Sequence, residues 1–199
     1  MLTLPKLILA SGSPRRAEIL TSVGWGFTKD SADIDETEQA GESPEDYVRR
    51  LALEKAEAVA QKYVEAIILG ADTTVVINHQ IIGKPVDFED AKRMLKMLSG
   101  KWHEVLTGVA LVKTNPQSAT GNRQSIVGIE RTRVKFAEMS GAEIEFLAEK
   151  GEPLDKAGAY AVQAQAALFI EGIEGDYWNV VGLPVNLVYN LIRDLARHD

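Results

Sequence analysis

The chain of 199 residues contains no cysteine. It therefore has no disulfide, no thiol nucleophile and no cysteine–zinc site. Its three histidines, His79, His103 and His198, lack the spacing of zinc ligands, which argues against zinc catalysis. Ser11 and Ser13 have no recognisable histidine partner, and no G-x-S-x-G motif is present, so serine hydrolysis is not expected either.

Positive charge is also scarce, because 22 lysines and arginines face 29 acidic residues and give a net charge of −7. Nucleic acids and anionic membranes both need a positive protein surface, so neither is expected as a partner. The sequence has no apolar run of membrane-spanning length. Its first apolar run is too short for the hydrophobic region of a signal peptide, so the expected location is cytoplasmic.

The remaining sequence alternates between strand-like and helix-like patterns without internal repeats. Strands are predicted at residues 7–10, 66–70 with an extension over 73–77, 80–82, 103–112, 125–136 and 167–173, with a hairpin loop over 113–124. Helices are predicted after residue 13, from 44 to about 62, and at 87–98, 140–150 and after 184. The second has Ser43 as its cap, the third an apolar stripe of Ala91, Met94, Leu95 and Leu98, and the fourth a capping box of Ser140 and Glu143. The mixture of hairpins and strand–helix units predicts an α/β fold, a twisted mixed β-sheet flanked by helices.

The first strand-to-helix turn combines two serines with two arginines in the motif S-G-S-P-R-R, residues 11–16. Helix N-termini favour anions, and the forked donors of arginine match phosphate oxygens. The motif therefore indicates phosphate binding, although it is not a Walker A loop, since G-x-x-x-x-G-K is absent. The alternative is an ordinary helix start, with Ser13 as the cap and Pro14 in the first turn.

Lys55 lies on the apolar stripe of its predicted helix, in line with Val48, Leu51 and Val59. Lysines usually avoid such a face. One interpretation is an ammonium group aimed into a binding site. The other is a lysine whose stem packs at the edge of the core while its charge reaches solvent.

Two groups of carboxylates are candidates for metal binding or acid–base chemistry. Asp72 is predicted just after the buried strand 66–70, where α/β sheets bind ligands, and it suits a metal ligand or a general base. The alternative is a turn cap. Asp33, Asp35 and Glu36 form an acidic cluster that is either a solvated loop or, with nucleotide phosphates, a source of Mg²⁺ ligands.

Two loops of small residues each present one polar side chain. Gly83-Lys84-Pro85 holds Lys84 directly after a hairpin strand, and the loop over residues 155–163 ends at Gln163. An amide donates and accepts hydrogen bonds together, so Gln163 is suited to reading the edge of a base. Ordinary turn chemistry is the alternative for both loops.

Taken together, these motifs resemble the Maf family of nucleoside triphosphate pyrophosphatases. The matching motifs are SGSPRR at 11–16, DE at 35–36, LEKA at 53–56, GADTTV at 70–75, GKP at 83–85, LSG at 98–100, HEV at 103–105, TGV at 107–109, EPLDKAGAYAVQ at 152–163 and GDYWNVVGLP at 175–184. Each is weak alone, but their order and combination are specific. GADTTV together with DKAGAYAVQ resembles the branch of the family that acts on dTTP and UTP.

The resemblance implies a fold similar to the inosine triphosphate pyrophosphatases, in a single domain over residues 1–199 with two lobes and a cleft between them. It also implies hydrolysis between the α and β phosphates, a divalent metal cofactor (Mg²⁺ or Mn²⁺) and a homodimer. Residue chemistry and resemblance together assign catalysis to Asp72, Lys55 and Lys84, metal binding to Glu36 and Asp72, phosphate binding to Ser11, Ser13, Arg15, Arg16, Lys55 and Lys84, and base choice to Arg15, Thr73 and Gln163.

Two other functions remain open at this point. One is a nucleotide-binding regulator of cell division and septum formation with little turnover. The other is a purine-selective pyrophosphatase acting on inosine triphosphate. Release of pyrophosphate by the purified protein separates the first from an enzyme, and a panel of substrates separates the second.

Overall fold

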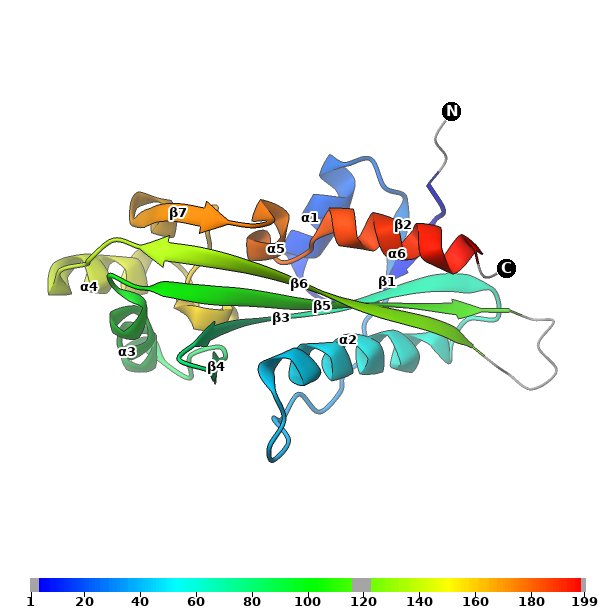
Figure 1. Ribbon diagram of the computed structural model, residues 1–199, viewed down its shortest axis with the longest axis horizontal. Helices are drawn as coiled ribbons and strands as arrows, with labels where there is room; N and C mark the ends of the chain where they lie inside the picture. The colour runs from blue at the N-terminus through cyan, green and yellow to red at the C-terminus, as the bar shows by residue number, and fades with distance from the viewer. Residues whose placement is uncertain (1–3, 116–122, 198–199) are drawn as a thin grey trace. The chain divides into compact units, whose positions relative to one another are not determined.

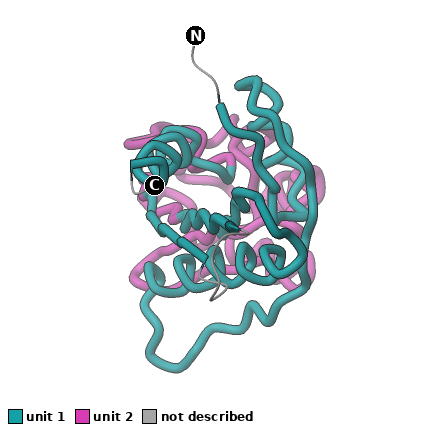
Figure 2. The backbone as a smooth tube through the Cα atoms, turned by 90° about the vertical axis from the view of Figure 1, so that its right-hand side faces the viewer, with its two compact units in different colours: residues 1–72, 107–130, 182–199 teal, residues 73–106, 131–181 magenta. Residues whose placement is uncertain are grey.

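The computed structural model describes residues 4–115 and 123–197. The chain divides into two compact units, each built from separate segments (Figure 2). Unit 1 comprises Met1–Asp72, Thr107–Glu130 and Gly182–Asp199, and unit 2 comprises Thr73–Leu106 and Arg131–Val181. The cleft between two lobes stays a prediction from the sequence.

The described part of the chain contains strands, α-helices and short 3₁₀ helices. The strands are β1 (Leu7–Leu9), β2 (Phe27–Lys29), β3 (Ala66–Ile77), β4 (Gln80–Ile82), β5 (Trp102–Thr114), β6 (Gln124–Phe136) and β7 (Ile170–Glu174). The α-helices are α1 (Pro14–Ser22), α2 (Pro44–Ala60), α3 (Phe88–Leu98), α4 (Gly141–Lys150), α5 (Tyr177–Val181) and α6 (Val185–Arg197). The 3₁₀ helices are η1 (Pro153–Asp155), η2 (Ala157–Ala159) and η3 (Gln165–Leu168).

The strands form one mixed sheet in the order β2-β1-β3-β5-β6-β7, with β4 paired to β3. β1 is parallel to both of its neighbours, and Leu7 lies opposite Phe27 in β2 and Ile67 in β3. The β3–β4 and β6–β7 pairs are antiparallel. The predicted α/β class, a mixed sheet flanked by helices, is confirmed.

In unit 1, helices α2 and α6 cover opposite faces of the strands (Figure 1). The packing of α2 is close because the strands carry glycines beneath it. A Cβ atom added to Gly70 would lie 2.1 Å from the carbonyl oxygen of Ala52, and one added to Gly108 would lie 2.1 Å from that of Val48. These glycines allow α2 to lie directly on β3 and β5.

In unit 2, α3 and α4 pack with strand residues and η2 in one apolar core. The predicted apolar stripe of α3 is fully buried and consists of Ala91, Met94, Leu95 and Leu98. Helix α4 begins with the predicted capping box, in which the Ser140 and Glu143 side chains each bond to the other's backbone N–H. The sequence pattern thus predicts α3 and α4 correctly.

A cluster of three aromatic rings lies inside the unit 2 core. The ring centroids of His103, Phe136 and Tyr160 are 4.9–5.5 Å apart. His103 Nε2 lies 2.7 Å from the Tyr160 hydroxyl oxygen, whereas its Nδ1 is buried with no partner among the described residues. Burial lowers the pKa of His103 from 6.5 to about 4 and raises the pKa of Tyr160. Both groups are therefore neutral at physiological pH.

The structure differs from the sequence prediction at three places. β3 runs without a break from Ala66 to Ile77, so Asp72 lies inside a strand, and the prediction that it follows a strand end or caps a turn is wrong. The β-branched residues after Asp72 favour continuation of the strand. The strand predicted over 167–173 begins only at Ile170, because the preceding residues form η3. The short elements β2 and α5 were not predicted.

Most of the hairpin loop predicted over residues 113–124 lies outside the described residues. Among the described helices, none combines the length and the apolar character needed to cross a membrane.

Candidate functional site

The turn between β1 and α1 is organised by two of its own side chains. The Ser11 hydroxyl is buried and accepts hydrogen bonds from the Ser13 backbone N–H at 3.2 Å and from Arg16 Nη1 at 3.0 Å. Arg16 Nε donates to the carbonyl oxygen of Gly182 at 2.9 Å. Ser13 is the N-cap residue of α1 and Pro14 the first residue of the helix, as the alternative interpretation predicts. The Ser13 side chain makes no cap hydrogen bond, and its backbone N–H donates to Ser11 instead.

Arg16 carries its positive charge into a nearly closed environment, because only 8% of the residue is exposed. Burial lowers the pKa of Arg16, and the nearby charges of Asp72 and Glu36 raise it, while Arg15 opposes them. An arginine remains protonated under such conditions. The turn therefore holds a fixed cation close enough to Asp72 and Glu36 for all three charges to interact.

Lys55 joins two carboxylates that are far apart in the sequence. Its Nζ lies 2.6 Å from Asp72 Oδ1 and 2.7 Å from Glu36 Oε1. The side chains of Lys55 and Asp72 are 13% and 10% exposed, whereas that of Glu36 is 48% exposed. The position of Lys55 on the apolar stripe therefore brings its ammonium group to a polar cluster, as the first of the two interpretations expects.

The pKa of Asp72 is raised by burial, although the charges of Lys55 and Arg16 pull it down. A carboxyl with a raised pKa accepts a proton more readily than an exposed aspartate. Strongly perturbed carboxyls beside fixed cations are typical of catalytic sites. The geometry thus allows Asp72 to act as a proton acceptor next to two positive charges.

The donor set of Glu36 and Asp72 suits a hard divalent cation, since both offer carboxylate oxygens to one common point. Within the described residues, no group of three or more His, Asp or Glu side chains is placed to hold a metal ion. Mg²⁺ in proteins is commonly held by one or two carboxylates together with substrate phosphates. The two carboxylates therefore match the protein part of a site for a divalent cation that phosphate groups also bind.

Tyr47 of α2 contacts the backbone of Glu36, and Arg50 of the same helix contacts the next residue, Thr37; the sequence pattern indicated neither contact. The Tyr47 hydroxyl donates to the carbonyl oxygen of Glu36 at 3.0 Å. Burial and the charges of Asp72 and Glu36 raise the pKa of Tyr47 to about 12. Arg50 Nη2 donates to the carbonyl oxygen of Thr37 at 3.1 Å.

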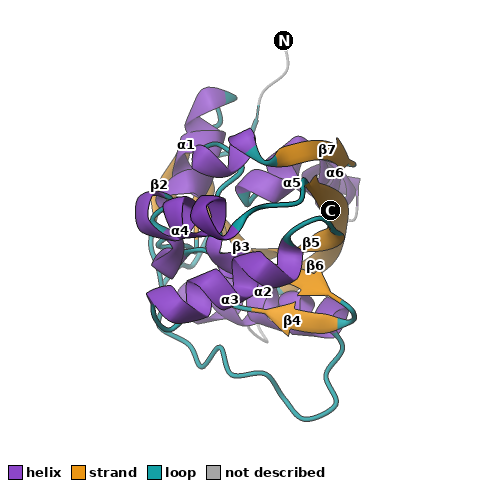
Figure 3. Cartoon of the chain, turned by 90° about the vertical axis from the view of Figure 1, so that its left-hand side faces the viewer, coloured by secondary structure: helices purple, strands orange, loops and turns teal. Residues whose placement is uncertain are grey.

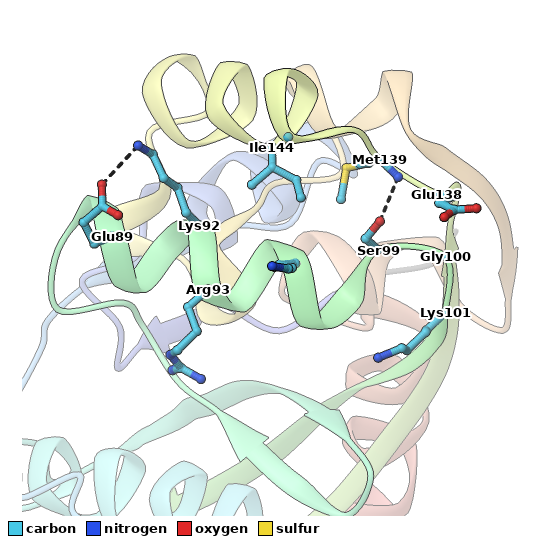
Figure 4. Close-up of a pocket in the computed structure, with 11 residues that line it drawn as sticks. Glu89, Lys92, Arg93, Ser99, Gly100, Lys101, Glu138, Met139 and Ile144 are labelled. Carbon is cyan, nitrogen blue, oxygen red and sulfur yellow. Dashed lines mark hydrogen bonds and ion pairs between the residues drawn. The ribbon is translucent and has the colours of Figure 1, made fainter.

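A cavity of about 850 Å³ lies in unit 2 between α3 and the start of α4. Basic side chains line it, but Figure 4 shows Lys92 and Arg93 pointing to different sides of α3. Lys92 is paired with Glu89 at 3.1 Å, and Arg93 with Asp90 at 2.7 Å. None of the predicted site residues lines this cavity, so it is a separate feature of the surface.

A family model described as Maf-like protein matches residues 6–195. The chain belongs to the Maf family. Its relatives include proteins named dTTP/UTP pyrophosphatase from Hahella chejuensis, 51% identical over 96% of this chain and 92% of the relative, and from Koribacter versatilis, 48% identical over 94% and 93%. A third, from Bacillus cytotoxicus, is 46% identical over 98% and 96%. Among solved structures, the Ham1 protein of Staphylococcus aureus aligns with a TM-score of 0.45 and 14% identity over 67% of this chain and 72% of that chain, a likeness too low to carry an argument.

The predicted site residues of this Maf chain divide between the two units. Unit 1 brings together the charged groups discussed above, which are Arg15, Arg16, Glu36, Lys55 and Asp72, with Ser11 beneath Arg16. Unit 2 contains Lys84, Thr73 and Gln163.

In unit 2, the loop that carries Lys84 contacts the loop that ends at Gln163. The carbonyl oxygen of Gly83, next to the exposed Lys84, accepts a hydrogen bond from the Gly158 N–H at 3.0 Å, so the two predicted loops do meet. Gln163 is exposed in a turn, and Thr73 is half-buried in β3. Their roles toward a nucleotide stay predictions.

Proposed function

We propose that this Maf protein hydrolyses dTTP and UTP between the α and β phosphates, releasing the nucleoside monophosphate and pyrophosphate. The observation that carries the proposal is the buried Lys55–Asp72 pair beside Arg16, since phosphoryl chemistry needs fixed cations and a positioned proton acceptor. The choice of dTTP and UTP is supported by the relatives that bear these substrates in their names.

In this mechanism the turn carrying Arg15 and Arg16 binds phosphate oxygens, and Lys55 neutralises charge on the reacting group. A water oxygen forms a bond to phosphorus while the bridging P–O bond breaks, and the bond electrons leave with the departing phosphate oxygen. The proton of the water passes to the Asp72 carboxylate. These reaction steps require no covalent intermediate between substrate and protein.

The proposal includes a Mg²⁺ or Mn²⁺ ion held by Glu36 and Asp72 together with the substrate phosphates. When bound, such an ion supplies positive charge that stabilises the charge developing on the phosphate oxygens. Because Lys55 contacts both carboxylates, its ammonium group would share these oxygens with such an ion. A homodimer and a cytoplasmic location remain further predictions. The location is supported by the relatives, whose names give free nucleotides as their substrates.

The experiment is a panel of dTTP, UTP, CTP, GTP and inosine triphosphate with the purified protein and Mg²⁺ or Mn²⁺, with the products identified by chromatography. We expect pyrophosphate and the monophosphate from dTTP and UTP, at kcat/KM values at least about 10-fold above that of CTP. Nucleotide binding without pyrophosphate release would favour the regulator of cell division. Preference for inosine triphosphate would favour the purine-selective enzyme.

Base choice is tested in the same panel with Gln163→Ala. Uracil and thymine share one hydrogen-bonding edge, whereas cytosine reverses the donor pattern at position 4 and lacks the N3 proton. An amide fixed against this edge would be left unpaired with cytosine, so its loss should bring the UTP and CTP rates closer together. Arg16→Ala is the matched comparison and should slow every substrate by a similar factor, because phosphates are common to all. An unchanged UTP-to-CTP ratio in Gln163→Ala would remove Gln163 from base recognition.

A further inference from the structure

The segment that carries Glu36 is only weakly anchored by apolar contacts, since Ala32 packs against the core of unit 1 but is itself only partly buried. Residues 30–43 connect β2 to α2 without regular secondary structure (Figure 3), and we call them the acidic loop. No residue of the acidic loop is buried. Hydrophobic burial, the usual force that fixes a segment, therefore contributes little to its conformation. The position of Glu36 must be set by polar contacts.

The strongest of these contacts is a fork of Arg50 on Glu42. Arg50 Nε lies 2.6 Å from Glu42 Oε1, and Nη2 lies 2.8 Å from Oε2, so the pair is bidentate. The two side chains are only 17% and 8% exposed, which protects the pair from solvent. Arg50 Nη2 also donates to the Thr37 carbonyl oxygen, and Nη1 lies 3.3 Å from Glu54 of the same helix. A single guanidinium thus ties two points of the acidic loop to α2.

Glu36 directly precedes Thr37, the nearer of these two points, and its own backbone is held as well. Its carbonyl oxygen accepts the Tyr47 hydroxyl at 3.0 Å. The following residue, Thr37, donates its backbone N–H and its hydroxyl to Asp35 Oδ1 at 2.9 and 2.6 Å. The Glu36 side chain is half-exposed, yet its Oε1 is held 2.7 Å from Lys55 Nζ. The half-exposed Glu36 carboxylate therefore keeps its position because the backbone that carries it is fixed.

We propose that Arg50 and Tyr47 are positioning residues that hold the acidic loop so that Glu36 faces Lys55 in the reactive site. The inference rests on the proposed function, in which Glu36 takes part. Helix α2 carries both sides of this device, since Tyr47, Arg50 and Lys55 all project from it. The helix thereby determines the positions of both the Lys55 ammonium group and the Glu36 carboxylate that contacts it.

The alternative is that Arg50 and Tyr47 merely stabilise the fold. The two roles make different predictions, because a loop in which every residue is at least partly exposed can detach, and return Glu42 to solvent, at limited cost to global stability. If Arg50 and Tyr47 are positioning residues, the loss of their contacts to the acidic loop leaves the melting temperature almost unchanged while the reaction slows. A role in overall stability would lower the melting temperature and leave kcat/KM per folded molecule unchanged.

The test compares Arg50→Met with Arg49→Met, a matched control on the same helix whose side chain is 54% exposed and reaches Asp46 only at 4.0 Å. We expect Arg50→Met to lower kcat/KM for dTTP about 10-fold or more, since small misplacements of reactive groups are costly. Amide hydrogen exchange in residues 30–43 should rise in Arg50→Met and stay as in the wild type in Arg49→Met. Tyr47→Phe, which removes one hydroxyl only, should change both readouts in the same direction.

A second comparison shows whether Arg50 acts through Glu36. In a Glu36→Gln background, Arg50→Met should lower kcat/KM less than about 2-fold further, because the residue it positions is already disabled. An equal loss in both backgrounds would overturn the proposal, and so would faster exchange in the loop with unchanged kcat/KM. If the wild type releases no pyrophosphate from dTTP or UTP, the proposed function fails instead. These outcomes are distinguishable in one set of assays.

Discussion

Lys55 places a positive charge between two carboxylates in a region that excludes most of the solvent. Removing two charges from water is costly, and their mutual attraction roughly offsets that cost when the geometry is good. Removing only one partner leaves the other buried and uncompensated. From the apolar stripe alone, Lys55→Met would be expected to preserve or raise stability. The contact with Asp72 reverses that expectation.

We predict that Lys55→Met lowers the free energy of unfolding by about 3 kcal/mol at pH 7, because Asp72 loses its partner. In the double variant Lys55→Met/Asp72→Asn, the carboxylate charge that Lys55 would leave unpaired is removed as well. Part of the lost stability should return, although the buried Arg16 loses one nearby negative charge. All three proteins are compared by urea unfolding, and both variants should be inactive toward dTTP. A single variant as stable as the wild type would show that the pair contributes nothing to the folded state.

Helix α2 owes its position to two glycines in the strands beneath it. Gly70 and Gly108 both leave room for backbone atoms of the helix at distances that no side chain permits. Since α2 also carries Tyr47, Arg50 and Lys55, a small shift of this helix moves the whole cluster. The strand glycines therefore affect the site without contacting it.

We predict that Gly70→Ala destabilises the protein by about 2–3 kcal/mol, because the added methyl group overlaps the helix backbone. Gly26→Ala is the control, as a Cβ there meets nothing within 4 Å, and it should change stability by less than about 0.5 kcal/mol. Thermal unfolding measures both, and kcat/KM should fall only in Gly70→Ala. Equal effects of the two substitutions would mean that α2 can move away without cost.

Periodicity and capping residues predicted the long elements well. The apolar spacing of α3 and the Ser43 and Ser140 caps are local signals that survive folding, and all three are found in the structure. The roles of Arg50 and Tyr47 leave no local signal, because their partners lie on a loop whose path depends on the folded unit. Sequence thus indicated the charged groups of the site but not the contacts that hold them.

The aromatic cluster of unit 2 makes the stability of the whole protein depend on pH. The pKa of His103 is about 4 in the folded state and about 6.5 when it is exposed. Between these values only the unfolded chain binds the proton, so stability is complete above pH 6.5 and declines as pH falls toward 4. A difference of this size corresponds to about 3 kcal/mol.

We predict that this decline is reduced in His103→Phe/Tyr160→Phe, which removes both polar groups of the pair together and leaves neither one unpaired. Urea unfolding at pH 7 and pH 4.5 should show a loss about 2–3 kcal/mol smaller in the double variant than in the wild type. Other titrating groups, Asp72 among them, are common to both proteins and cancel in the comparison. Equal losses would show that His103 takes up its proton without unfolding.

The hydrogen bond from Arg16 to Gly182 spans 166 positions of the chain. During translation, Gly182 is therefore added to the chain 166 residues after Arg16. A nascent chain cannot complete this turn until the segment that carries Gly182 has left the ribosome. The proposed anion site is thus finished by a contact made late in synthesis and not by the turn alone.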